Sequence, residues 1–125
     1  TRTKVDLMDL VWEMNDIVER TVEYAFQGKY MFCMYDYLKQ NKATKRDVQE
    51  FVDGSTARSM QITIYDLEDY LEGGNDSQHK QLREAYGHLG KPEARKIKDY
   101  LNKILEDAWK YEQEKRPGRR RKASK

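Results

Sequence analysis

The residues best suited to a defined chemistry are basic side chains close to the C-terminus. Residues 115–125 contain seven cations and no acid: Lys115, Arg116, Arg119, Arg120, Arg121, Lys122 and Lys125. Each cation that contacts a phosphate releases counterions from a nucleic acid, and arginine can hold a phosphate through two hydrogen bonds. Because Pro117 and Gly118 interrupt regular structure, we expect a disordered basic tail that binds a polyanion. The alternatives are a nuclear-localisation signal in a eukaryotic protein, or a solubilising tail that folds back on acidic helices.

The rest of the chain has the opposite charge. Residues 1–114 hold 17 of the 24 cations and all 22 acids, which gives this part a formal charge of −5. Two acidic stretches, residues 3–27 and 55–76, each have a charge of about −4. The charge pattern therefore leaves two functions open. The tail supplies affinity for a nucleic acid, or the acidic helices dock a basic protein partner.

A second pattern lies in residues 44–74. A threonine and an acid begin one helix, a turn follows, and three apolar residues are regularly spaced in the next helix: Thr44, Asp47, Gly54, Ser55, Met60, Ile64 and Leu67. This segment resembles the helix-turn-helix of DNA-binding proteins, including its winged-helix forms. The same residues also fit two capped helices of an ordinary helical bundle.

The resemblance implies that the second helix of this segment lies in the major groove and reads base edges. Its outward-facing residues would be Thr56, Arg58, Ser59, Gln61 and Thr63. Arginine can read guanine and glutamine can read adenine. The resemblance favours DNA over RNA as the nucleic acid, and the sequence leaves both open. The protein would then act in transcription, replication or packaging.

A third candidate combines aromatic and basic residues between positions 29 and 46. The aromatic residues are Tyr30, Phe32, Tyr35 and Tyr37, and the cations are Lys29, Lys39, Lys42, Lys45 and Arg46. Aromatic rings beside cations can stack the bases of a single strand. Tyrosine is also common at the edge of a core, with a buried ring and a solvated hydroxyl, and this use is the more ordinary one. Lys45 and Arg46 remain candidates for phosphate contacts.

Enzymatic and metal sites find no support in the sequence. His79 and His88 are nine residues apart, and neither this spacing nor the distant Cys33 matches a zinc site. A glycine-rich phosphate loop and an activated nucleophile are also missing. We therefore expect a protein that is not an enzyme and binds no cofactor or metal.

The protein is expected to be intracellular. A single cysteine allows no internal disulfide, which fits a reducing compartment. The sequence contains neither a secretory signal nor an apolar run of the roughly 20 residues that span a bilayer, so no membrane contact is expected. The compartment would be the nucleus in a eukaryote, and the cytoplasm or nucleoid in a bacterium or virus.

Helices must position these candidates, because apolar residues recur at helical spacing along most of the chain. The predicted helical segments are 3–28 after a capping box at Thr3 and Asp6, 29–40, 44–54 after a second box, 55–71 capped by Ser55 or Thr56, 82–90, and 92–111. The second segment is expected to bury Tyr30, Cys33, Met34, Tyr37 and Leu38. Met60, Ile62 and Ile64 also alternate, which leaves open a short strand at 60–64, but the periodicity through Leu71 favours a helix.

The expected fold is all-α, a compact bundle of five to six helices formed by residues 1–114, with the disordered basic tail at 115–125. The first and last helices are the longest. Their apolar stripes can pack together within one chain, or they can form the seam of a homodimer. Packing within the chain is the more ordinary arrangement.

Overall fold

The computed structural model of the chain describes the backbone of residues 4–114 and the side chains of residues 10–114. The elements are α1 (Lys4–Ala25), α2 (Met34–Gln40), α3 (Lys45–Val52), α4 (Ser55–Glu72), α5 (Ser77–Tyr86), the short 3-10 helix η1 (Gly87–Leu89) and α6 (Lys91–Glu114). Residues 4–114 contain no strand. The predicted all-α bundle is therefore confirmed, while the expected disorder of 115–125 lies outside the described residues.

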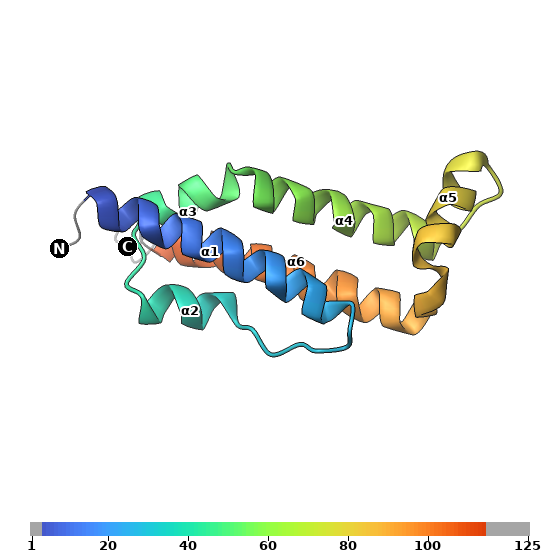
Figure 1. Cartoon of the computed structure of the whole chain (residues 1–125), viewed down its shortest axis with the longest axis horizontal. Helices are drawn as coiled ribbons and strands as arrows, with labels where there is room; N and C mark the ends of the chain where they lie inside the picture. Colours follow the sequence, from blue (N-terminus) through green and yellow to red (C-terminus); the bar gives the residue numbers. More distant parts are fainter. Residues whose placement is uncertain (1–3, 115–125) are drawn as a thin grey trace, which may run out of the picture.

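Helix α6 is the centre of the bundle. It packs against α1, α2, α3 and α4, and its most extensive contact is with α4. Figure 1 shows α1, α4 and α6 running lengthwise through the molecule, with α2 and α3 near one end and α5 at the other. The long first and last helices thus bury their apolar stripes within one chain.

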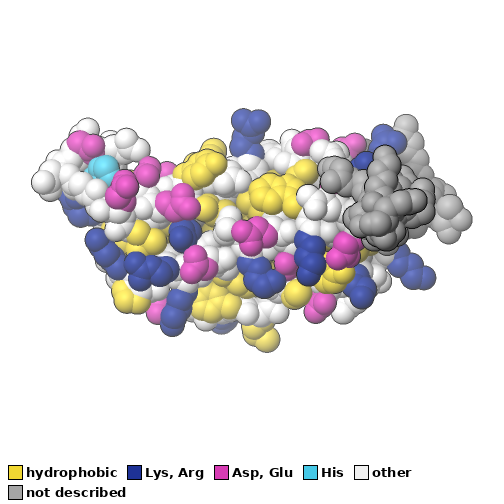
Figure 2. Space-filling model, turned by 180° about the vertical axis from the view of Figure 1, so that it is seen from behind, with side chains coloured by type: hydrophobic (Ala, Val, Ile, Leu, Met, Phe, Trp, Pro, Cys, Tyr) yellow, Lys and Arg dark blue, Asp and Glu magenta, His cyan; other side chains and the backbone are white. Residues whose placement is uncertain are grey.

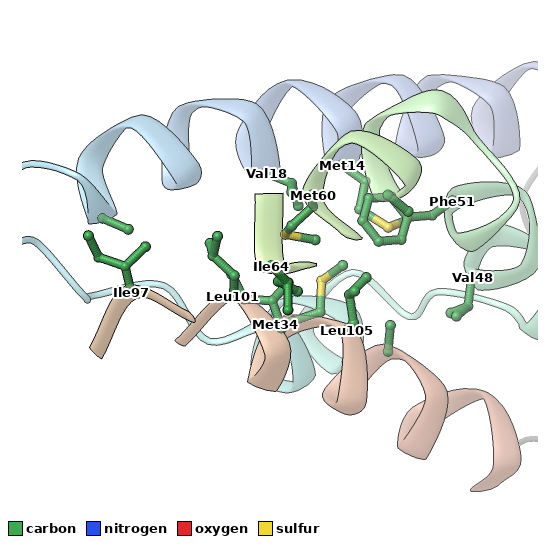
Figure 3. Packing of buried hydrophobic residues seen from close by; sticks show 14 of the residues in the cluster. Met14, Val18, Met34, Val48, Phe51, Met60, Ile64, Ile97, Leu101 and Leu105 are labelled. Carbon is green, nitrogen blue, oxygen red and sulfur yellow. The ribbon is translucent and has the colours of Figure 1, made fainter. Parts of the chain in front are cut away.

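The core consists of residues spaced three or four apart on these helices. Met14 and Val18 of α1, Phe51 of α3, and Leu101 of α6 are completely or almost completely buried, and Figure 3 shows their side chains meeting between the ribbons. This spacing puts one face of each helix toward the same interior. The hydrophobic stripes seen in the sequence are therefore what assembles the bundle.

Residues 60–64 form part of helix α4, so the alternative of a short strand is wrong. Ile64 is 2% exposed and Ile62 is 54% exposed. Met60 and Leu67 are buried on the same side as Ile64. The packed residues Met60, Ile64 and Leu67 thus follow the helical period of three to four, whereas Ile62, which fits only the alternating pattern, is exposed.

The second predicted helix begins five residues later than expected, because residues 29–33 are not helical. Gly28 ends the preceding turn with φ +84°. The Tyr100 hydroxyl of α6 then accepts a hydrogen bond from the Phe32 amide at 2.9 Å and lies 3.2 Å from the Phe32 carbonyl. Cys33, predicted to be buried, is exposed. Tertiary contacts with α6 therefore replace the first turns of a helix here.

The helix caps were predicted with mixed success. Thr44 and Asp47 form the expected capping box at the start of α3. Helix α4 is capped by Gly54 rather than by Ser55 or Thr56, and no side chain bonds its first amides. The predicted cap at Thr3 lies outside the described residues.

Candidate nucleic-acid interface

Five exposed cations gather at the end of the bundle where α2, α3 and the end of α6 meet. We call this set the basic corner: Lys39, Lys42, Lys45, Arg46 and Lys110. The chain from 39 to 46 contains no acid. The Tyr35 ring joins its two sides, since the Lys39 and Lys110 amines lie 5.8 and 5.0 Å from its centroid. The basic corner is thus made by segments about 70 residues apart in sequence.

The turn between α2 and α3 presents three of these cations. Lys42 has φ +51°, the left-handed conformation that reverses the chain, and the next residue, Ala43, is buried. The Tyr111 hydroxyl of α6 donates a hydrogen bond of 2.6 Å to the Ala43 carbonyl. The buried alanine fixes the turn, so its basic neighbours point into solvent.

Helix stability does not account for the cations at the start of α3. Lys45 and Arg46 lie in the first turn, where the helix dipole disfavours positive charge. Arg46 has an ion-pair distance of 3.9 Å to Glu50, but both side chains are well exposed, so the pair contributes little. These two cations therefore remain available to an external anion.

The C-terminal end of α6 lies beside the basic corner. The Tyr35 hydroxyl donates a hydrogen bond of 2.7 Å to the carboxylate of Glu114, the last described residue of α6. This bond raises the pKa of Tyr35 above its ordinary value. The basic residues 115–125 follow directly in the sequence. Their side chains, including the six predicted to bind nucleic acid from Lys115 to Lys122, lie outside the described residues.

The aromatic residues of this region serve mainly to pack the bundle. Tyr30 meets Tyr100 edge to face with ring centroids 5.2 Å apart, and the Tyr37 hydroxyl donates to the Glu13 carboxylate at 2.8 Å. Burial, and then this hydrogen bond, raise the pKa of Tyr37 far above its ordinary value. The Tyr35 ring, in contrast, is bordered by two cations of the basic corner.

The predicted reading residues of α4 do not all face outward. Arg58 and Ser59 are exposed, and Gln61 and Thr63 are half-buried. Thr56 is 7% exposed, and its hydroxyl lies 3.2 Å from a carboxylate oxygen of Glu19 on α1. The expectation that Thr56 faces a ligand is therefore wrong, because this residue ties α4 to α1.

Arg58 and Gln61 border an open hollow between α4 and α6, with a volume of about 450 Å³. Three exposed hydrophobic residues line the same hollow: Ile62, Tyr65 and Trp109. Trp109 lies four residues after the buried Leu105 on α6, but 45% of it is exposed. Figure 2, seen from the face opposite to Figure 1, shows hydrophobic side chains exposed between charged ones.

The structure thus divides the predicted site residues into two places. Lys45 and Arg46 belong to the basic corner, whereas Arg58 and Gln61 border the α4–α6 hollow with Ser59 exposed nearby on α4. A further basic stretch, residues 79–98, was missed although it holds six cations and two acids. Its charge was visible in the sequence, but the balance taken over residues 1–114 concealed it.

Residues 4–114 were also compared with the requirements of a membrane-spanning helix and of a metal site. No helix there is both long and apolar enough to traverse a bilayer. No three His, Cys, Asp or Glu side chains in the described part of the chain converge as metal ligands would. Comparison with protein-family models, with curated proteins and with solved structures gave no match for this chain.

Proposed function

We propose that this chain is a non-enzymatic nucleic-acid-binding protein, a regulator or accessory factor of transcription, replication or packaging. The observation that carries the proposal is the position of the basic corner. Its five exposed cations lie on α2, on the turn before α3, in the first turn of α3 and near the end of α6, and the seven cations of residues 115–125 follow α6 in the chain. A surface and a segment of the same charge, covalently joined, suit the phosphate backbone of a nucleic acid.

The α4–α6 hollow supplies groups of the kind that contact bases. Phosphate contacts position a protein on a nucleic acid, whereas base contacts provide selectivity. Arg58 and Gln61 can donate and accept hydrogen bonds at base edges, and the exposed Tyr65 and Trp109 rings offer surfaces for stacking. Under this proposal the helix-turn-helix resemblance makes the first half of α4 the reading element, with DNA as the preferred ligand.

Fluorescence anisotropy with labelled duplex and single-stranded DNA, measured at several salt concentrations, tests the proposal. The variant K45Q/R46Q/K110Q removes three charges of the basic corner, and a second variant lacks residues 115–125. Each phosphate contact contributes about 0.9 to the slope of log K against log salt for duplex DNA. We therefore expect the triple variant to reduce the slope by up to about 3, and the truncation to reduce it further.

The control is R20Q/R95Q/K96Q, which removes the same charge from α1 and from the beginning of α6. Residues 95 and 96 lie about 20 Å along α6 from Lys110, at 1.5 Å per residue. Binding by the control should match the native chain. Equal losses in the triple variant and the control would show that only net charge matters, and would refute the basic corner as the interface. No binding at low salt would refute the proposal altogether.

A second function, a protein-interaction module, is favoured by one specific observation. Ile62, Tyr65 and Trp109 are 54%, 56% and 45% exposed around one hollow. Exposed hydrophobic residues at the centre and charged ones at the rim are typical of a protein interface. The acids of α4 continue beyond this centre, which suits a basic partner such as an amphipathic helix.

Trp109 itself can report such binding. Trp12, the other tryptophan, is 69% exposed. Its replacement by phenylalanine leaves Trp109 as the single tryptophan, which can be excited selectively. Titration with a basic amphipathic peptide should shift the Trp109 emission to shorter wavelength, and Ile62→Ser should weaken the peptide affinity. The effect should persist without residues 115–125. An unchanged emission spectrum at saturating peptide would contradict this function.

A further inference from the structure

The end of the bundle opposite the basic corner contains a small pocket. It lies where the chain passes from α4 through α5 to α6, and it is lined by Tyr70, Gly73, His79, Arg83, Gly87 and Lys91. Its volume is about 170 Å³, enough for a few water molecules or one small polyatomic anion. Figure 1 shows α5 at the far end of the molecule from α2 and α3. This pocket is therefore separate from the candidate nucleic-acid interface.

Three nitrogen-bearing side chains converge on the turn formed by Gly73 and Gly74. One Arg83 guanidinium nitrogen donates a hydrogen bond of 2.6 Å to the Gly74 carbonyl. A Cβ atom on Gly74 would lie 2.6 Å from His79 Nδ1, and a Cβ on Gly73 would lie 3.9 Å from the Lys91 amine. The two glycines thus allow an imidazole, a guanidinium and an ammonium group to approach the same turn.

Asp76 fixes the histidine of this cluster. Its carboxylate caps α5 by accepting from the His79 amide at 2.9 Å, and it also lies 2.7 Å from His79 Nδ1. These bonds lower the pKa of Asp76, the backbone bond contributing most. On the other side of the ring, His79 Nε2 is buried and has no hydrogen-bond partner among the described residues. Asp76 therefore fixes the orientation of the ring through Nδ1.

Several cations lie on α5 and α6 around the pocket. Lys80 is exposed on α5, Arg95 is exposed and Lys98 is half-buried on α6, and the acids between 79 and 98 are only two, Glu84 and Glu93. Figure 2 shows magenta acidic side chains next to a histidine at this end of the molecule, and dark blue basic side chains below them. Lys91 forms no ion pair with any described residue. Arg83 bonds a carbonyl rather than a carboxylate, so neither of the two cations that line the pocket is neutralised by an ion pair with a described residue, although Asp76 lies against the histidine.

We propose that this pocket binds one phosphate group, either as inorganic phosphate or as the phosphate of a small phosphomonoester. Arg83 uses one nitrogen to hold the turn, and its remaining N–H groups can form paired hydrogen bonds with phosphate oxygens. Lys91 adds a compact charge on the other side. The inference does not depend on the nucleic-acid interface, since it concerns a different end of the bundle.

Isothermal titration calorimetry of the full chain with inorganic phosphate tests this site, with sulfate and chloride as comparison anions. Phosphate should bind saturably to one site, and chloride should not. Lys91→Met keeps the side-chain length and removes the charge, so it should weaken binding about tenfold without unfolding the protein. Arg83→Lys retains the charge but lacks the planar fork, and should also weaken phosphate binding.

Gly87 provides a control for charge alone. It lines the pocket, and a Cβ added there meets no atom within 4 Å, so substitution is sterically tolerated. Gly87→Asp and Gly87→Asn have nearly the same shape, and only the aspartate repels an anion. We expect the aspartate variant to bind phosphate at least about fivefold more weakly than the asparagine variant.

The source of the phosphate group is resolved by titrating glycerol phosphate in parallel. Tighter binding of the ester assigns the pocket to phosphomonoesters, and tighter binding of inorganic phosphate assigns it to the free ion. No saturable binding of either probe would overturn the proposal. So would native-like phosphate binding by both the Lys91→Met and the Gly87→Asp variants, because the site would then lie elsewhere.

Discussion

The hydrogen bond from Tyr111 to Ala43 allows the clearest quantitative prediction. It joins α6 to the turn that presents the basic corner, and its donor and acceptor are 68 residues apart in sequence. Both residues are only 2% exposed. We predict that Tyr111→Phe, which removes the hydroxyl and keeps the ring, destabilises the whole bundle.

The size of this effect follows from burial. A hydrogen bond contributes about 0.5–1.5 kcal/mol net, but a buried acceptor left without a donor costs about 1–3 kcal/mol. The Ala43 carbonyl has little access to water, so we expect a loss of about 2 kcal/mol in the free energy of unfolding. For a chain of this length that loss corresponds to a decrease in Tm of about 7 °C.

Urea unfolding followed by circular dichroism, together with a thermal scan, measures the change. Tyr65→Phe is the matched control, since the Tyr65 side chain is 56% exposed and donates no hydrogen bond to a described residue. Its effect should stay within about 0.5 kcal/mol. Amide exchange should also accelerate at Ala43 and Thr44 in the Tyr111→Phe variant.

Equal unfolding curves for Tyr111→Phe and the native chain would refute this reasoning. Such a result would mean that water reaches the Ala43 carbonyl once the hydroxyl is removed. Loss of stability without faster exchange at Ala43 would place the effect elsewhere around the ring. The turn would then need another source of rigidity.

Three further predictions concern the core, the tyrosines and the glycine turn. Leu101→Ala, at a residue with 0% exposure, should cost about 3–4 kcal/mol in urea unfolding. Burial raises the pKa of Tyr37 above its ordinary value of 10.0. The neutral hydroxyl therefore stabilises the fold fully below about pH 10, and this stabilisation declines as pH rises further. Tyr37→Phe should flatten the decline of Tm in an alkaline titration. Gly74→Ala should cost about 1–3 kcal/mol because its Cβ would overlap His79. Gly87→Ala, which meets no atom within 4 Å, should be neutral or slightly stabilising in the same assay.

The helices were predictable because their signals are local. Hydrophobic spacing along α1, α4 and α6 gave the correct core faces, and the Thr44 and Asp47 box marked the start of α3. Residues 29–33 were mispredicted because the deciding contact is Tyr100, 68 residues away from Phe32. A pattern read within one segment cannot include a partner so distant in the chain.

The candidate sites were less predictable than the helices. Thr56 was expected to face a ligand, but the approach of Glu19 from α1 buries it. Trp109 continues the apolar spacing of α6, yet 45% of it is exposed. Two consecutive glycines such as Gly73 and Gly74 indicate only a break between helices. Their second role, admitting His79 and Arg83 to one turn, depends on how α5 folds back.

The negative charge of residues 1–114 is a poor guide to the surface of the bundle. Residues 39–46 hold four cations without an acid, residues 47–78 hold one cation and eight acids, and residues 79–98 hold six cations and two acids. Folding separates the two basic stretches, because the turn before α3 and the beginning of α6 lie at opposite ends of the molecule (Figure 1). Each end therefore carries its own group of cations, which the average over residues 1–114 conceals. Truncation of residues 115–125 should weaken the salt-dependent binding of a polyanion without abolishing it, because the basic corner remains.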